Sequence, residues 1–215
     1  MIRTVLFDLD GTLTDSGRGI CNSVRYALDR HGFPEAEEAV LRSFVGPPLV
    51  ERFMSVCGVS EDEARRMVTT YREYYVRQGI FENEVYPGIP LLLQDLRRAG
   101  RRIALATSKP EIFARQVLEH FDLLRLFDAI AGEDLREPRD SGKPALIARC
   151  MALLGAKKSE TVMVGDRNYD VEGGKACGIG TIGVLYGYGS REELEAAGAD
   201  HLAASAAEVL EYCLK

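Results

Sequence analysis

The chain has 215 residues, of which 46% are hydrophobic and 28% charged, and its formal net charge is −6. This composition predicts a globular protein, with either one domain or a core that carries an inserted subdomain. The acidic balance and the lack of a basic block leave nothing for nucleic acid or an anionic membrane to bind. No apolar run reaches membrane-spanning length either. From the charge balance and this length, we expect neither a nucleic-acid polymer nor a membrane as a partner.

The cysteines predict a reducing environment. They are scattered, odd in number and without CxxC spacing: Cys21, Cys57, Cys150, Cys177 and Cys213. This pattern favours free thiols over a disulfide framework or a zinc site. The N-terminus runs directly into an apolar segment without the features of a signal peptide. We therefore expect a cytoplasmic protein.

The first predicted strand, residues 5–7, ends in two acids, Asp8 and Asp10. Within a strand, residues i and i+2 point to the same face, so the two carboxylates would repel each other if the strand continued. Gly11 predicts that the chain turns at Asp10 instead. Two acids at the carboxyl end of a strand need a cation or a proton to hold them together.

Residues 16–83 contain three helical patterns and no convincing strand. The first pattern ends at Gly32, the second stops before the Gly-Pro-Pro break at 46–48, and a capping box from Ser60 to Glu63 opens the third. The turn signal at 86–88 marks the return of the chain. We predict a helical subdomain of residues 16–83, inserted into a core of residues 1–15 and 84–215.

The rest of the chain alternates strands with helices. Apolar, β-branched runs predict strands at 103–107, 161–164 and 181–186, with a further short strand possible at 128–132. Helical patterns at 91–100, 112–121 and 144–155 separate most of them. This alternation predicts an α/β fold with a Rossmann-like, doubly wound parallel sheet.

Polar residues cluster where the predicted strands end. Ligands of open parallel sheets bind at the carboxyl ends of the strands. The residues that this rule brings to one edge are Asp8, Asp10, Gly11, Thr107, Ser108, Lys143, Asp166 and Asp170. We therefore expect carboxylates, a hydroxyl group, an ammonium group and turn amides to meet there.

This set of groups suits phosphoryl transfer, which needs positioning and charge neutralisation above all. Asp8 would attack phosphorus, and Asp10 would protonate the leaving oxygen and later activate water. Thr107, the neighbouring amides and Lys143 would hold phosphate oxygens. Mg²⁺ prefers oxygen ligands and binds substrate phosphate, and Asp166 would complete its site. Asp170 would be a further ligand or a support for one.

Each residue also has a purely structural interpretation. Paired acids near a turn occur widely as solvated groups. Thr107 and Ser108 could cap the next helix, and Lys143 could be a surface lysine. Asp166 and Asp170 could be a helix N-cap and a first-turn acid. What favours the catalytic interpretation is their common placement after strands, in one order along the chain.

Taken together, these residues resemble the haloacid dehalogenase superfamily, in its phosphoglycolate phosphatase-like or 5'-nucleotidase-like branch. The matching segments are DLDGTLTD at 8–15, LATSKP at 105–110, Lys143 with Pro144, and GDRNYD at 165–170. The resemblance implies a mobile helical cap and hydrolysis through a phosphoaspartate on Asp8. It places Mg²⁺ on the Asp8 carboxylate, the Asp10 backbone carbonyl and Asp166, with Asp170 as a further candidate.

Three functions remain open at this point. The first is a Mg²⁺-dependent phosphatase, monomeric or weakly dimeric, for a small phosphate ester such as phosphoglycolate or a nucleoside 5'-monophosphate. The second is a phosphomutase of the β-phosphoglucomutase type, and the third is a non-enzymatic binder. Arg18 and Arg52 could contact an anionic substrate or could simply be solvated. The GxGxxG sequence at 178–183 follows a helical pattern and leads into a strand, so it does not predict a dinucleotide site.

Overall fold

The computed structural model describes residues 1–135 and 142–215. The described chain forms two compact units: Met1–Thr14 together with Val85–Lys215, and Asp15–Glu84. We call the first the core unit and the second the helical unit. The two crossings of the chain between them pair as a two-stranded sheet, β2 (Thr14–Asp15) with β3 (Glu84–Val85).

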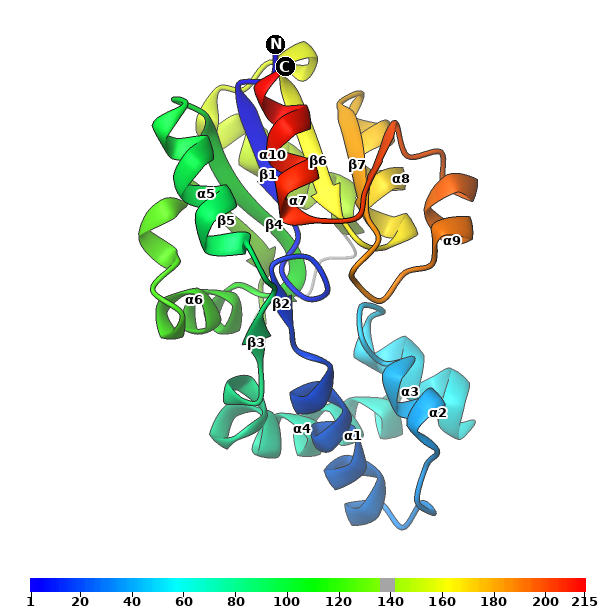
Figure 1. Ribbon diagram of the computed structural model, residues 1–215. Helices are drawn as coiled ribbons and strands as arrows, with labels where there is room; N and C mark the ends of the chain where they lie inside the picture. The colour runs from blue at the N-terminus through cyan, green and yellow to red at the C-terminus, as the bar shows by residue number, and fades with distance from the viewer. Residues whose placement is uncertain (136–141) are drawn as a thin grey trace. The chain divides into compact units, whose positions relative to one another are not determined.

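The core unit contains a six-stranded sheet with the order β5-β4-β1-β6-β7-β8 (Figure 1). All of its pairings are parallel; Val5, for example, lies opposite Ile103 on one side and Val162 on the other. The strands are β1 (Thr4–Phe7), β4 (Arg102–Pro110), β5 (Ala129–Glu133), β6 (Thr161–Gly165), β7 (Gly180–Val184) and β8 (His201–Ala203). The predicted α/β fold with a doubly wound parallel sheet is confirmed.

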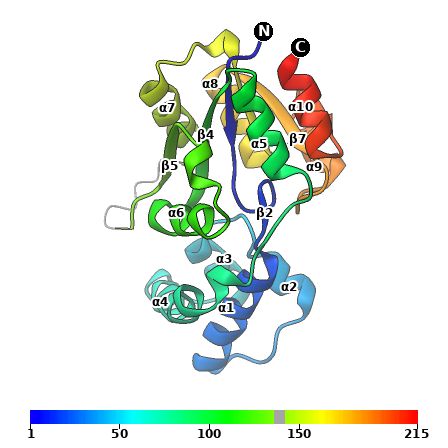
Figure 2. The same cartoon turned by 60° about the vertical axis from the view of Figure 1, so that its left-hand side comes forward.

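Helices cover both faces of this sheet, which explains why the middle residues of its central strands are apolar. On one face α7 packs beside α8, and on the other α5 packs beside α10 (Figures 1 and 2). The bounds are α5 (Ile89–Arg98), α6 (Glu111–His120), α7 (Gly142–Leu154), α8 (Asn168–Cys177), α9 (Arg191–Ala196) and α10 (Ala206–Leu214), with short 3₁₀ turns at Leu124–Leu126 and Lys158–Glu160. All four residues of β1 are buried.

The helical unit contains α1 (Gly17–Arg30), α2 (Glu38–Arg42), α3 (Leu49–Cys57), α4 (Glu61–Arg77) and a 3₁₀ turn at Gly79–Phe81. Aromatic side chains form much of its interior: the rings of Phe44 and Phe53 lie 4.8 Å apart, and those of Tyr71 and Tyr75 stack at 5.5 Å. Of the capping box predicted at Ser60, the structure shows the N-cap half, a bond from the Glu63 backbone N–H to the Ser60 hydroxyl, whereas the Glu63 carboxylate bonds to His31 and Arg66. Packing of apolar faces therefore holds this unit together.

The structure differs from the sequence predictions in the following elements. Helix α3 was not predicted, because the Pro47-Pro48 pair reads as a break, whereas Pro48 occupies the N-cap position of a new helix. Strand β8, with helices α9 and α10, was not assigned. The strand predicted to reach 186 ends at Val184.

Other predictions hold. The five cysteines are free thiols. Gly178 closes α8 in the left-handed conformation and Gly180 begins β7, so the GxGxxG sequence lacks the strand-to-helix context of a dinucleotide motif. Over residues 1–135 and 142–215, every helix is too short or too polar to cross a membrane.

Candidate active site

The acid-bearing loop between β1 and β2 is a tight turn. Strand β1 ends at Phe7, and the carbonyl of Leu9 accepts hydrogen bonds from the backbone N–H groups of residues 12, 13 and 14. Gly11 has φ +87°, and a Cβ there would lie 2.2 Å from a carboxylate oxygen of Asp166. Only glycine fits this position, because the conformation and the close approach both exclude a side chain. The predicted turn after the first strand is confirmed.

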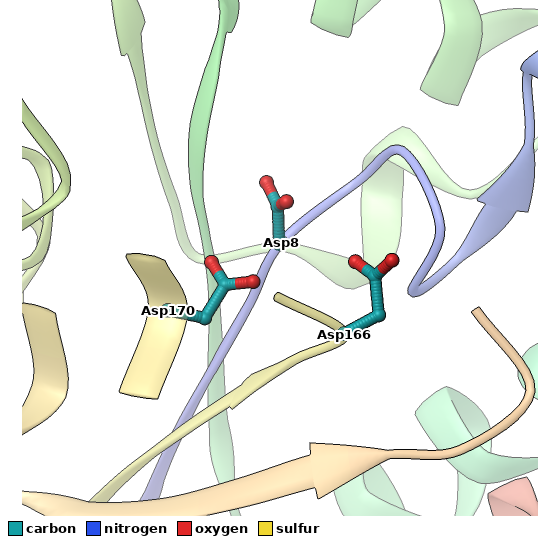
Figure 3. A group of neighbouring side chains, drawn as sticks. All are labelled: Asp8, Asp166 and Asp170. Carbon is teal, nitrogen blue, oxygen red and sulfur yellow. The ribbon is translucent and has the colours of Figure 1, made fainter. Parts of the chain in front are cut away.

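Three carboxylates converge at the carboxyl edge of the sheet. Asp8 follows β1, Asp166 follows β6, and Asp170 lies in the first turn of α8, and their carboxyl groups face a common space (Figure 3). One oxygen from each lies within 4.8 Å of the others. Asp166 and Asp170 are buried, and Asp8 is largely so. Such crowding of like charge requires cations or protons.

Lys143, in the first turn of α7, supplies one of these cations. Its ammonium nitrogen lies 3.0 Å from Asp8 Oδ1 and 2.8 Å from Asp170 Oδ1, and it donates to the carbonyl of Ala106 at 3.1 Å. The side chain is only 5% exposed. Burial alone would lower the pKa of Lys143, but the charges of Asp170 and Asp8 outweigh it and raise that pKa. Lys143 is therefore a buried cation and not the surface lysine of the structural interpretation.

Asp166 is held by two donors. The Thr12 hydroxyl donates to Oδ1 at 3.2 Å, and the backbone N–H of Tyr188 donates to Oδ2 at 2.8 Å. Burial, with the nearby charges of Asp170 and Asp8, raises the pKa of Asp166 to about 8. Its carboxyl group therefore holds a proton near neutral pH unless a cation takes the place of that proton.

Asp170 has a structural and an electrostatic role together. Its Oδ2 accepts the backbone N–H of Arg167, which closes the first turn of α8, while Oδ1 faces Lys143. Burial raises the pKa of Asp170 to about 6, although Lys143 opposes that rise. The N-cap of α8 is Arg167, so the interpretation of Asp166 as an N-cap is wrong, whereas Asp170 is the first-turn acid expected.

Asp10 forms a second ion pair that the sequence analysis did not identify. Lys109 Nζ donates to both carboxylate oxygens of Asp10, at 2.8 and 2.6 Å, and only 6% of the Lys109 side chain is exposed. Lys109 follows Thr107 by two positions in β4. That spacing, which places two side chains of a strand on the same face of the sheet, was the available signal that Lys109 could accompany Thr107.

The remaining candidates lie at the end of β4 and in the acid-bearing loop. Thr107 is buried and its hydroxyl accepts the backbone N–H of Lys109 at 3.2 Å, and Ser108 is partly exposed beside it. Neither caps a helix, because Pro110 occupies the N-cap position of α6. The backbone N–H of Gly11 donates to the carbonyl of Thr14 at 2.8 Å.

The loop between β7 and α9 packs against the acid-bearing loop and Asp166. A Cβ on Gly187 would lie 2.3 Å from both the carbonyl oxygen of Gly11 and the Cβ of Asp166. The hydroxyl of Tyr186 donates to the carbonyl of Thr12 at 3.2 Å. Burial raises the pKa of Tyr186 above its usual range, which keeps this hydroxyl a donor. Backbone contacts of this kind have no signature in residue types, so the sequence did not reveal them.

The charges of the site fit a divalent cation. The edge carries four carboxylates, Asp8, Asp10, Asp166 and Asp170, against the two ammonium groups that pair with them, Lys109 and Lys143. With all four carboxylates ionised, as when a cation takes the place of the Asp166 proton, two negative charges are left in a largely buried site with oxygen donors only. Mg²⁺ suits that donor set in charge and in ligand type.

Comparisons with known proteins agree with this geometry. Residues 5–184 match the model of the haloacid dehalogenase-like hydrolase family. A 5'-nucleotidase of Pseudomonas aeruginosa is 43% identical over 94% of this chain and 91% of its own length. A phosphoglycolate phosphatase of Vibrio parahaemolyticus is 31% identical over 98% and 95%, respectively.

One curated relative has a different name, and a solved structure is similar over its full length. The tyrosine-protein kinase PtkA of Mycobacterium tuberculosis is 43% identical over 89% of this chain, which spans only 65% of that relative. A crystal structure described as a predicted phosphatase from Clostridium acetobutylicum has a TM-score of 0.94 and 43% identity, and covers 100% of this chain and 99% of its own. As its sequence motifs predicted, the chain belongs to the haloacid dehalogenase-like hydrolases.

Proposed function

We propose that the chain is a Mg²⁺-dependent phosphatase that hydrolyses a small phosphate monoester through a phosphoaspartate on Asp8. The observation that carries this proposal is the placement of Asp8 beside the buried ammonium group of Lys143, with a second acid, Asp10, two residues further along the same turn. One carboxylate is thereby available as a nucleophile and the other as a proton carrier.

The reaction has two displacement steps at phosphorus. A carboxylate oxygen of Asp8 bonds to phosphorus while the bond from phosphorus to the ester oxygen breaks, and the leaving oxygen takes the proton of Asp10. Asp10 then removes a proton from a water molecule whose oxygen attacks the same phosphorus. Phosphate leaves and the Asp8 carboxylate is restored. Lys109 would hold the Asp10 side chain in position through its two hydrogen bonds.

Oxygen ligands for the metal would come from Asp8, the Asp10 carbonyl and Asp166. Bound there, Mg²⁺ would neutralise charge on the phosphate oxygens as the bonds change. Asp170 accepts the N–H of Arg167 and faces Lys143, which suits a residue that positions its neighbours. Phosphate oxygens would be held by Thr107, Ser108, Lys143 and the amides near Gly11.

The identity of the leaving group is a separate question. The names of the relatives support phosphoglycolate or a nucleoside 5'-monophosphate as candidate substrates. We propose that the helical unit, predicted as a cap of residues 16–83, selects between them. Arg18 is exposed on α1, whereas Arg52 Nε donates to the Ser43 hydroxyl at 3.0 Å and lies 5.9 Å from the Phe44 ring centroid. Arg18 is therefore the arginine better suited to meet a substrate anion.

A second candidate is transfer of the phosphoryl group to a hydroxyl other than that of water. The 43% identity with a protein named as a tyrosine kinase favours keeping this candidate, and the phosphomutase alternative belongs to the same class. Both would use Asp8 as the phosphoryl carrier. They differ from a phosphatase in the acceptor, so the products distinguish them.

The deciding experiment measures phosphate release from phosphoglycolate, nucleoside 5'-monophosphates and sugar phosphates, with Mg²⁺ and with a chelator. Asp8→Asn is the test variant, and Asp62→Asn, an exposed acid of α4, is the matched control. Mg²⁺-dependent release that the wild type and Asp62→Asn share, and Asp8→Asn lacks, would establish the phosphatase. Sugar-phosphate isomerisation, or labelling of a tyrosine peptide from ATP, without phosphate release would replace it with the transferase.

A further inference from the structure

Tyr186 lies just beyond β7 and contacts two segments that come from distant parts of the core unit. Its hydroxyl donates to the backbone carbonyl of Thr12 at 3.2 Å. Its ring lies 5.0 Å from the ring of Tyr86, with an angle of 55° between the planes. Tyr86 directly follows β3, where the chain returns to the core unit. The side chain of Tyr186 therefore links this return segment to the acid-bearing loop.

Thr12 is the residue that carries the effect of this contact into the site. It is fully buried, and its hydroxyl donates to Asp166 Oδ1 at 3.2 Å. Its own N–H donates to the carbonyl of Leu9 within the turn. With its amide used by the turn and its carbonyl held by Tyr186, the residue has its backbone fixed at both ends. A fixed backbone restricts the rotamers of the β-branched Thr12 side chain, and in the rotamer present its hydroxyl meets Asp166 Oδ1.

The return segment holds the neighbouring carbonyl in the same way. The backbone N–H of Tyr86 donates to the carbonyl of Leu13 at 3.1 Å. Two consecutive carbonyls of the acid-bearing loop, those of residues 12 and 13, are thus bonded by two tyrosines whose rings contact each other. Linked hydrogen bonds of this kind constrain a loop more than isolated ones do.

We infer that Tyr186 is a positioning residue for the Mg²⁺ site, acting through Thr12 on the Asp166 carboxylate. The inference rests on the proposed function, because it assigns Asp166 to the metal. Tyr186 donates to a backbone carbonyl, and the group that reaches Asp166 is the Thr12 hydroxyl. Its hydroxyl sets the affinity for the ion by fixing the orientation of a ligand before the ion binds.

The test is calorimetric titration of metal-free protein with Mg²⁺, without substrate. Tyr186→Phe keeps the ring and removes only the hydroxyl, and we expect it to raise the Mg²⁺ dissociation constant roughly threefold to tenfold, the effect of one hydrogen bond. Thr12→Val should raise it at least as much, and Thr12→Ser should restore it. Tyr212→Phe is the matched control, because Tyr212 stacks on His201 in another part of the core unit.

The double variant Tyr186→Phe with Thr12→Val distinguishes a shared route from two separate effects. If Tyr186 acts through Thr12, the double variant should bind Mg²⁺ no more weakly than Thr12→Val alone. Fully additive effects would overturn the route through Thr12. An unchanged dissociation constant in Tyr186→Phe, with or without a lower melting temperature, would overturn the positioning role itself.

Failure of the proposed function would look different. If wild type took up no Mg²⁺, the metal site would be wrong and this inference would fall with it. If wild type bound Mg²⁺ and released phosphate while Tyr186→Phe matched it in both, only the inference about Tyr186 would fail.

Discussion

The acid edge of the core unit and the helical unit place charge in opposite ways. The core unit has surface ion pairs, such as Arg125 with Asp122, but at its acid edge the ion pairs lie inside: the side chains of Lys143, Asp8 and Asp170 are 5%, 13% and 2% exposed. In the helical unit, ion pairs such as Arg65 with Glu61 lie at the surface, and the interior is aromatic and aliphatic. Each arrangement has its own energetic consequence.

Surface ion pairs contribute little to stability, whereas a buried pair must overcome the desolvation of both charges. The helical unit therefore depends on packing for its stability. The acid edge of the core unit keeps charges that packing alone would exclude, and these are the charges that phosphoryl transfer needs. The stability of the helical unit should respond to changes in side-chain volume. The stability of the acid edge should respond to changes in charge, pH and bound metal.

The largest effect is expected from Lys143→Met. The variant leaves Asp8 and Asp170 buried without their cation, which should lower the free energy of unfolding by about 3–5 kcal/mol. Loss of a donor beside the reacting phosphorus should reduce kcat at least about a hundredfold. Urea denaturation and phosphate release measure the two effects, with exposed Lys157→Met as the control. Unchanged stability would show that the buried charges do not govern the acid edge.

Phe53→Ala tests whether packing governs the stability of the helical unit. Phe53 is fully buried against Phe44 in the helical unit, so its removal should cost about 3–5 kcal/mol of that unit's stability through the cavity left behind. Phe81→Ala, at a side chain 53% exposed in the same unit, should cost little. The Mg²⁺ dissociation constant should not change in either, because every candidate ligand belongs to the core unit. A weaker Mg²⁺ affinity in Phe53→Ala would contradict the view that packing in the helical unit and metal binding in the core unit are independent.

The pH dependence of metal-free protein is the next largest expected effect. The carboxyl pKa of Asp166 is about 8 when folded, against an ordinary value of 3.8. Between those values the folded chain holds a proton that the unfolded chain has released, so rising pH favours unfolding. The shift of Asp170 to about 6 acts in the same direction. We expect the melting temperature to fall by about 5 °C or more between pH 5 and pH 8.

Two controls make that measurement specific to the acid edge. Saturating Mg²⁺ should remove most of the fall, because the ion binds the ionised carboxylate in place of the proton. Asp166→Asn should flatten the curve without metal. A wild-type melting temperature that rises over this pH interval would contradict the assignment of Asp166 as the acid that is protonated when the metal is absent.

The same contrast explains what the sequence could predict. Buried parallel strands have apolar sequences, which predict where each strand ends. Acids or a hydroxyl residue that directly follow such a run can be identified from the sequence. Asp8, Asp166 and Thr107 could therefore be placed on one edge of the sheet. The α/β core followed from the same runs. In the helical unit, the pattern of α3 was hidden behind Pro47 and Pro48, because a proline that ends one segment can also precede the next helix.

The parts of the site that stayed hidden depend on contacts between distant segments. Lys109 pairs with Asp10 across 99 positions, and Tyr188 holds Asp166 with a backbone N–H that any residue except proline could supply. Close packing of Gly187 on Asp166 is a matter of backbone approach. Such contacts become visible only when the strand order is known, since they join the ends of different strands.

The smallest expected effect compares two helix caps of the same kind. Ser60 accepts the N–H of Glu63 at the start of α4, and Ser190 accepts the N–H of Glu193 at the start of α9. Replacing either serine by alanine should cost about 1 kcal/mol of stability. The consequences should differ, because Glu193 Oε1 also accepts the backbone N–H of Asn168 at 2.9 Å, at the start of the helix that carries Asp170.

We therefore expect Ser190→Ala to lower kcat/KM about twofold to threefold. Fraying of α9 would weaken the hydrogen bond from the Asn168 N–H to Glu193, which holds the first turn of α8, and we expect only part of the energy of that bond to be lost. Ser60→Ala should leave the Mg²⁺ dissociation constant unchanged, because its helix contributes no candidate ligand. Steady-state kinetics, magnesium titrations and melting curves of both variants decide the matter. Equal loss of stability with equal kinetics would mean that α9 supports the fold alone, and that the contact from Glu193 to Asn168 does not reach the acids.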